Sequence, residues 1–166
     1  MKTAHKFFAS EGELQRWVVK KMVEQGWHAQ PLTEDPKYPG IPDITASHQS
    51  RVGDFWLELK CDRQEQYVWS NLKLKRRLTR QQHGWLTQRA THSSTPGPRC
   101  GVLVAWRFDL TEYVTWVPVN EWDYLRFENM AVWALLPQTA STGDLESGKV
   151  SFITLLSSDG QYQGKK

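Results

Sequence analysis

The chain has 166 residues, of which 39% are hydrophobic and 23% charged, and its formal net charge is +3 at pH 7. This composition describes one ordinary soluble domain that is large enough to bury a core. Two cysteines are far too few for a disulfide framework, and no apolar run approaches membrane-spanning length, which excludes a disulfide-rich scaffold and a transmembrane helix. The weak positive charge favours a polyanionic partner only where basic side chains cluster.

The first predicted element is a helix that begins after Ser10. Ser10 and Glu13 form the pattern of a capping box, apolar residues then recur at helical spacing, and Gly26 is a suitable C-terminal stop. A short strand is predicted over 27–30, followed by a loop rich in proline and charge.

Two short apolar runs, at 39–44 and 55–61, are predicted to pair as an antiparallel hairpin around a polar turn at 47–54. In the second run, Glu58 and Lys60 share one face of the strand, roughly 6.6 Å apart, while apolar side chains occupy the other face. A symmetric turn makes paired residue numbers sum to about 101, which sets Asp43 opposite Glu58 with Cβ atoms about 4.5–5.5 Å apart.

Two like charges at that separation repel, and a sheet built only for stability avoids them. A hard divalent cation removes the conflict, because carboxylate oxygens are its preferred ligands. The Lys60 ammonium beside them is suited to hold a phosphate oxygen or a water. Each residue also has a plainer interpretation: Asp43 as a turn residue, Glu58 as a solvent-facing strand residue and Lys60 as an edge lysine. Together they predict a site for phosphodiester hydrolysis.

Residues 62–77 mix charged, aromatic and aliphatic side chains and predict no clear element. Thr79 is a candidate cap for a helix that runs from Arg80 to about residue 90. The continuously apolar run at 101–106 predicts a strand buried on both faces. The run at 55–61, this helix and the run at 101–106 therefore form a predicted βαβ unit.

The last third of the chain predicts shorter elements. Strands are predicted at 113–117, 131–136 and 150–156, with a soft loop at 138–148. Asn120 is a candidate cap for a short helix, and the tail from residue 157 is expected to fray.

The pattern formed by Asp43, Glu58 and Lys60 resembles the signature of the PD-(D/E)xK nuclease superfamily. With Gly-Ile-Pro at 40–42 and Leu-Thr-Arg-Gln-Gln at 78–82, the chain is similar to the branch of VRR-NUC domains and Holliday-junction resolvases. The resemblance implies an α/β fold with a restriction-endonuclease-like core, in which helices flank a central mixed sheet of about four or five strands.

The resemblance also implies how the chain is divided and what it binds. The nuclease core is expected over 1–118, with 119–166 as a C-terminal extension packed on the same domain. One or two ions of Mg²⁺ or Mn²⁺ would be held by Asp43, Glu58 and the backbone carbonyl of Leu59.

Two further residues have both a functional and a structural interpretation. A first-helix glutamate often reaches the metal or its waters in such nucleases, and Glu13 is the best match, with Glu11 a weaker candidate. Gln82 stands where the pattern has a glutamine that contacts the active site or the nucleic acid. A capping box explains Glu13, and another with Thr79 explains Gln82, so both interpretations stay open.

The densest group of basic side chains follows the second apolar run, with aromatic residues just before it. Basic side chains for phosphates and aromatic ones for unpaired bases are what a nucleic-acid groove uses, although a run of charge is more often a solvated face. The predicted nucleic-acid-binding residues are Lys73, Lys75, Arg76, Arg77, Arg80, Tyr67 and Trp69.

The function predicted from these residues is a Mg²⁺- or Mn²⁺-dependent DNA endonuclease with the catalytic residues Asp43, Glu58, Lys60, Glu13 and Gln82. The resemblance implies a preference for branched DNA, a homodimer, and a protein of bacterial or phage type, and the two cysteines favour a reduced, cytoplasmic context. The competing interpretation is a protein that keeps the nuclease fold without catalysis and binds DNA or a protein partner. No histidine or cysteine spacing predicts a zinc site.

Overall fold

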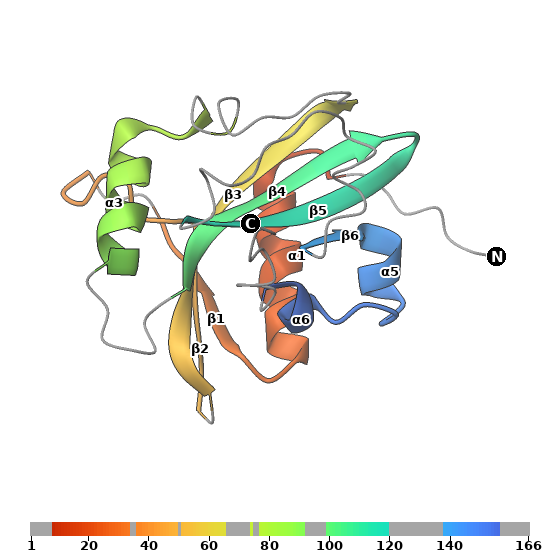
Figure 1. The fold of residues 1–166 in the computed structure, drawn as a ribbon, viewed down its shortest axis with the longest axis horizontal. Helices are drawn as coiled ribbons and strands as arrows, with labels where there is room; N and C mark the ends of the chain where they lie inside the picture. Colours follow the sequence, from red (N-terminus) through yellow and green to blue (C-terminus); the bar gives the residue numbers. More distant parts are fainter. Residues whose placement is uncertain are drawn as a thin grey trace, which may run out of the picture.

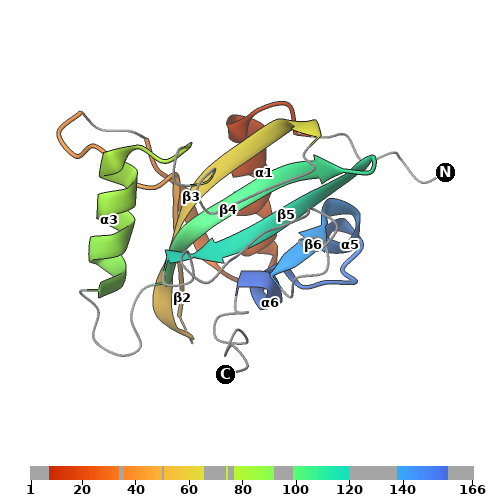
Figure 2. The same cartoon turned by 45° about the horizontal axis from the view of Figure 1, so that its top comes forward.

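The computed structural model describes residues 8–33, 36–49, 51–65, 74, 77–91, 99–119 and 138–156. The elements in chain order are α1 (Glu11–Glu24), β1 (His28–Pro31), β2 (Ile44–His48), β3 (Arg51–Glu65), α3 (Arg80–Thr91), β4 (Arg99–Phe108), β5 (Thr111–Pro118), β6 (Thr139–Ser141), α5 (Thr142–Glu146) and α6 (Phe152–Leu156). The strands form one mixed sheet with helices on both faces (Figure 1 and Figure 2). The predicted α/β class is confirmed, and the sheet has six strands rather than four or five.

The strands follow one another across the sheet in chain order, from β1 to β6. β3 and β4 pair in parallel, and the other four neighbouring pairs of this described sheet are antiparallel. Because α3 lies between β3 and β4 in the chain, the predicted βαβ unit is confirmed. β3 therefore has a paired strand on each side, which shields its middle from solvent.

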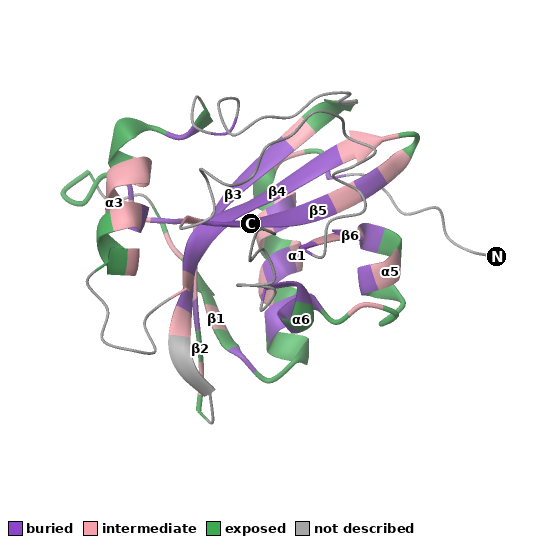
Figure 3. Cartoon of the chain, in the orientation of Figure 1, coloured by how far each residue is buried: buried purple, intermediate pink, exposed green. Residues whose placement is uncertain are grey.

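The two faces of the sheet bury separate cores, because side chains alternate along each strand. The odd-numbered side chains of 55–61 pack on one face with residues of α1, α5 and α6. Val104 of β4 and Leu86 of α3 belong to the core on the other face. Figure 3 shows the buried centres of β3, β4 and β5 between these layers. By the same alternation, Glu58 and Lys60 lie on the α3 face.

α1 begins and ends much as its sequence predicts. The Glu13 N–H donates to Ser10 Oγ at 3.2 Å, and Glu13 Oε2 accepts from the Ala9 N–H at 2.9 Å, which completes the capping box. After the last turn, Gly26 adopts a φ of +83° and leads the chain into β1. The buried residues of α1 are Leu14, Val18, Lys21 and Met22.

The hairpin of β2 and β3 has the predicted register but a tighter turn. Ile44 pairs with Leu57 and Ala46 with Phe55, so the paired numbers sum to 101 as predicted. The pairing then shifts beyond Ala46, and the two strands continue almost to their connection. The prediction of a broad turn over 47–54 is therefore wrong, because β2 extends to His48 and β3 begins at Arg51, and these two residues pair beyond the register shift. The first strand starts at residue 28, one later than predicted.

Two predictions for the last third are also wrong. Residues 150–156 contain the helix α6 in place of a strand, because its four buried apolar residues follow helical spacing over a run too short to identify from sequence. Residues 138–148 contain β6 and α5 in place of a loop. Ser141 caps α5 by accepting from the Asp144 N–H at 3.1 Å.

The described part of the C-terminal third joins the same sheet and core as the rest. β6 pairs with β5, and α5 and α6 contribute to the core shared with α1. Lys21 of α1 also forms an ion pair with Glu146 of α5 at 3.0 Å. The division between 1–118 and 119–166 stays a prediction.

Some predictions concern residues outside the described ranges. These are the helix after residue 120, the strand at 131–136 and the tail from 157. Among the helices within the described ranges, none is both long and apolar enough to cross a membrane.

Candidate active site

Glu58 and Lys60 come from the middle of β3 and are both buried. Glu58 is 1% exposed and Lys60 8% exposed. The Lys60 Nζ donates to Glu58 Oε1 at 2.8 Å. Taking charges out of water costs free energy that an ion pair often fails to repay, so stability alone is a poor explanation for a charged pair at the centre of a sheet.

Asp43 lies one residue before β2, at the next position of the register and hence opposite Glu58. Asp43 Oδ2 accepts from the Leu59 N–H at 2.7 Å, and Gln15 of α1 donates its Nε2 to the Asp43 carbonyl at 2.9 Å. The N–H and C=O of one strand residue point to the same side, so the Leu59 carbonyl also faces the Asp43 side of β3. Contacts from β3 and α1 thus hold Asp43 beside Glu58.

Gln82 of α3 makes both of the contacts that the sequence suggests for it. Its N–H donates to Thr79 Oγ1 at 3.1 Å, and its Oε1 accepts from the Thr79 N–H at 3.0 Å, which forms a capping box. The Nε2 of the same side chain donates to Glu58 Oε1 at 2.7 Å. One amide therefore links the start of α3 to the buried carboxylate of β3.

The loop that leads into Asp43 rests directly on the start of α3. Gly40 has a φ of +86°, and a Cβ built there would lie 2.4 Å from the carbonyl carbon of Gln81. Both the left-handed backbone and the close approach require glycine at this position. Gly40 thereby brings the loop against the residue that precedes Gln82.

The two oxygens of Glu58 are in different environments. Oε1 accepts from both Lys60 and Gln82, whereas the buried Oε2 has no hydrogen-bond partner among the described residues. Burial, reinforced by the negative charges of Asp43 and Glu11, raises the pKa of Glu58 to about 7 in spite of the Lys60 contact. Glu58 therefore has a buried acceptor oxygen that is left over for a ligand.

This set of oxygens fits a hard divalent cation. A cation beside Glu58 Oε2 would satisfy that atom and offset its repulsion with Asp43. Within the described ranges, no three histidine, cysteine, aspartate or glutamate side chains gather into a complete metal site. The remaining ligands would therefore be backbone carbonyl, water or substrate oxygens, which is common for Mg²⁺.

A second carboxylate, outside the candidate site, is also buried and also has a raised pKa. Glu112 of β5 is 4% exposed and accepts from the Phe8 N–H at 2.9 Å. Burial raises its pKa to about 7 in spite of that hydrogen bond and the charge of Arg107. Glu58 and Glu112 both bind a proton more tightly in the folded chain than in the unfolded one.

We therefore expect the metal-free protein to lose stability as the pH rises from 5 to 8. The stabilisation from a raised carboxyl pKa is complete below the unfolded value near 4.5 and is lost as the pH passes about 7. It amounts to about 3 kcal/mol or less for each group. Thermal unfolding in a chelator measures it, and Glu58→Gln and Glu112→Gln should each flatten the pH profile. A melting temperature that rises over this interval contradicts the expectation.

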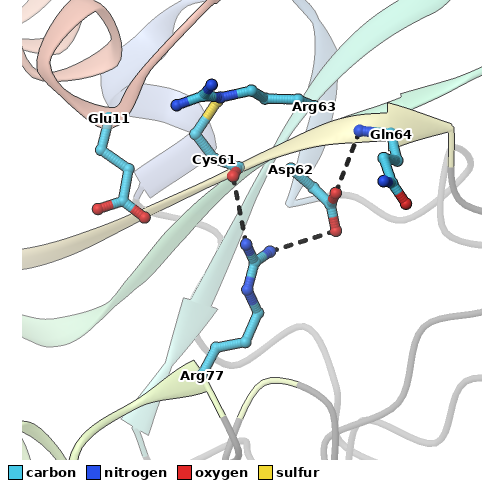
Figure 4. Close-up of a pocket in the computed structure, with 6 residues that line it drawn as sticks. All are labelled: Glu11, Cys61, Asp62, Arg63, Gln64 and Arg77. Atoms are coloured by element: carbon cyan, nitrogen blue, oxygen red, sulfur yellow. Dashed lines mark hydrogen bonds and ion pairs between the residues drawn. The ribbon is translucent and has the colours of Figure 1, made fainter.

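The two candidate glutamates of α1 lie in different places. The carboxylate of Glu13 caps the helix through the Ala9 N–H. The carboxylate of Glu11 lies near the end of β3, beside Cys61, and its charge contributes to the raised pKa of Glu58 (Figure 4). Residues two apart on a helix project about 200° apart, so both cannot face one site. The weaker sequence candidate, Glu11, is thus the one whose negative charge acts on Glu58, as the smallest of the contributions to its pKa.

The predicted nucleic-acid-binding residues are divided between the described and the undescribed parts of the chain. Lys73, Lys75, Arg76, Tyr67 and Trp69 lie outside the described residues. Arg80 is exposed at the first position of α3. Arg77 donates to Asp62 Oδ2 at 3.2 Å and to the Cys61 carbonyl at 3.3 Å, so it lies against the end of β3 that follows Lys60.

Sequence reasoning missed Gln15 and the contact that docks α3. Gln15 lies four residues after Glu11, so the two share a helix face, and this spacing is the signal that was available. Trp85 of α3 packs on Trp56 with ring centroids 5.0 Å apart, and the Arg89 guanidinium lies 4.9 Å from the Trp56 ring. Trp56 is on the same face of β3 as Glu58, so this contact holds α3 beside the site.

Neither a protein-family model nor a curated protein matches the sequence. Among solved structures, the chain is similar to Hjc from Archaeoglobus fulgidus, a Holliday junction resolvase from an archaeal hyperthermophile. The two share 16% sequence identity, the match covers 75% of this chain and 92% of that one, and the TM-score is 0.47. At this level the likeness carries no argument about chemistry, and the function proposed below is argued from this chain's own residues.

Proposed function

We propose that this protein is a metal-dependent nuclease that hydrolyses phosphodiester bonds in DNA. One observation carries the proposal: Asp43 and Glu58 lie on adjoining segments beside Lys60, and Glu58 keeps a buried oxygen without a hydrogen-bond partner among the described residues. Carboxylates that would repel each other, beside an ammonium group, suit a cation and a phosphate better than they suit a packed core.

Asp43, Glu58 and the Leu59 carbonyl would hold the cation. Mg²⁺ or Mn²⁺, when bound, would lower the pKa of a bound water and offset charge on the scissile phosphate. Lys60 supplies a positive charge at the same place, and its bond to Glu58 Oε1 fixes its direction. Gln82 donates to the same oxygen, which leaves Oε2 as the ligand atom. Glu11, whose charge acts on Glu58, would interact with the waters around the cation.

We expect wild-type protein to cut branched DNA faster than linear duplex when Mg²⁺ is present. This preference follows from the sequence resemblance to Holliday-junction resolvases, whose paired nicks also imply a homodimer. The test is a panel of four-way junction, flap, linear duplex and single-stranded substrates, with chelator as the control. Equal cutting of all four removes the junction preference and leaves the nuclease assignment, whereas cutting that survives the chelator removes the metal dependence.

The competing function is a nuclease-like fold that binds DNA or a protein without catalysis. It is favoured by one observation, that Glu58 already bonds to Lys60 and Gln82, which holds the site together without a metal. Calorimetric titration with Mn²⁺ separates the two functions. Binding at millimolar concentration or tighter that is lost in Glu58→Ala supports the nuclease, and absence of binding supports the competing function.

A further inference from the structure

A polar hollow of about 580 Å³ opens beside the end of β3, next to the candidate site (Figure 4). Its lining residues are Glu11, Cys61, Asp62, Arg63, Gln64 and Arg77. Asp62 lies two residues beyond Lys60 on β3, in the stretch where the pairing with β4 shifts register after Cys61. Glu11, at the other side of the hollow, is the same residue whose charge reaches Glu58. The hollow therefore begins at the residue of β3 that follows Lys60.

Arg77 is held in a fixed direction at the edge of this hollow. Asp62 Oδ2 and the Cys61 carbonyl each accept one of its N–H groups, and Asp62 Oδ1 accepts from the Gln64 N–H at 3.3 Å. The other three of its five N–H groups make no hydrogen bond with the described part of the chain. The Arg77 side chain is 37% exposed, so part of it can be reached from solvent.

Where Asp62 and Arg77 line the hollow, the polar groups that remain available to a ligand are hydrogen-bond donors. Both oxygens of Asp62 are already engaged, and they orient the guanidinium that lies below them (Figure 4). A guanidinium that is fixed in advance loses little side-chain entropy on binding, and its planar fork matches the oxygens of a phosphate. The ligand that suits the hollow is therefore an anion with several acceptor oxygens.

We propose that the hollow binds a backbone phosphate of the cut DNA strand, next to the scissile one, with Arg77 as its donor and Asp62 as the residue that positions Arg77. This proposal rests on the nuclease function proposed above, and it adds the path that the cut DNA strand follows on the protein. The cut strand runs along β3 from Lys60 toward Gln64, and its neighbouring phosphate lies over the guanidinium.

The first test measures DNA binding in chelator, where no cutting occurs. We expect Arg77→Gln to lower the slope of log affinity against log salt by about one unit and to weaken binding about tenfold near physiological salt. Arg77→Lys should keep the slope and lose part of the affinity, since it keeps the charge and loses the fork. Lys149→Gln removes an equal charge from an exposed side chain beyond α5, and should change neither quantity. Thermal melts establish that each variant is folded.

The second test replaces single phosphates of the substrate by neutral methylphosphonates, at positions numbered from the cut that wild-type protein makes in Mg²⁺. Wild-type protein should lose affinity when the linkage next to the cut is neutral, and Arg77→Gln should be insensitive to that same change. A loss that is equal in both proteins at this position overturns the proposal. So does an Arg77→Gln protein with the salt slope and affinity of the parent.

These outcomes separate the hollow from the nuclease assignment. If wild-type protein cuts DNA and Arg77→Gln binds like the parent, the proposal that the hollow binds phosphate is contradicted. The proposed nuclease function is then unaffected. If wild-type protein cuts nothing in Mg²⁺ or Mn²⁺ while Arg77→Gln still lowers the salt slope, Arg77 binds phosphate on a protein that is not a nuclease.

Discussion

Replacing Glu58 by glutamine is expected to abolish DNA cleavage and leave the fold intact. Cleavage in Mg²⁺ should fall on the order of 1,000-fold or more, because an amide cannot supply the charge that holds the cation. The folded chain should be no less stable than the parent at pH 8, because the substitution removes a buried charge that Asp43 repels. Single-turnover cleavage and thermal unfolding in chelator measure the two effects.

A matched control and a binding measurement make this result specific. Glu24→Gln changes an exposed carboxylate at the end of α1 and should cut like the parent. Mn²⁺ should raise the melting temperature of the parent at pH 8 and leave that of Glu58→Gln unchanged, because a cation that binds only the folded state stabilises it. Parental cleavage rates in Glu58→Gln, or in Asp43→Asn, would show that these carboxylates do no chemistry.

Replacing Gly40 by alanine is expected to damage both stability and activity. The new Cβ would lie 2.4 Å from the Gln81 carbonyl carbon and 2.5 Å from its oxygen, on a backbone with φ +86°. Strain and overpacking together should cost about 3 kcal/mol or more. Relief of the clash would move the loop off α3, and Asp43 and Gln82 lie on either side of that contact. Denaturant unfolding and cleavage rates on the same preparation measure the two losses.

Gly84→Ala provides the control for this prediction. Gly84 also lies near the site, within α3, but a Cβ there meets no atom within 4 Å. Alanine should therefore stabilise the helix by about 0.5–1 kcal/mol and leave cleavage unchanged. A Gly40→Ala protein that is as stable and active as Gly84→Ala would show that the loop does not need its contact with Gln81.

Local patterns were sufficient to predict the framework of the site. Alternation along 55–61 placed Glu58 and Lys60 together, and the symmetric hairpin placed Asp43 opposite Glu58. A strand period of two residues and a pairing rule determine both placements without knowledge of the rest of the chain. The helix of residues 80–91 and the parallel pairing of β3 with β4 followed from similar short-range signals.

The short elements at the C-terminal end could not be predicted from such local patterns. The five residues of α6 are too few for a helical period to differ clearly from a strand of apolar residues. The three residues of β6 become a strand because β5 offers an edge to pair with, and that edge is formed by a segment more than 20 residues earlier in the chain. In both elements, tertiary contacts select the structure.

The sequence by itself determined the α/β class, the βαβ unit and the facing of Asp43 and Glu58, because each depends on a local period or on one turn. Only the tertiary structure decided that Glu58 Oε2 is buried without a hydrogen-bond partner among the described residues, that Gln82 both caps α3 and bonds Glu58, and that the charge of Glu11 rather than that of Glu13 contributes to the raised pKa of Glu58. Those features depend on how α1 and α3 are turned against the sheet, and that orientation is set by packing between segments far apart in the chain.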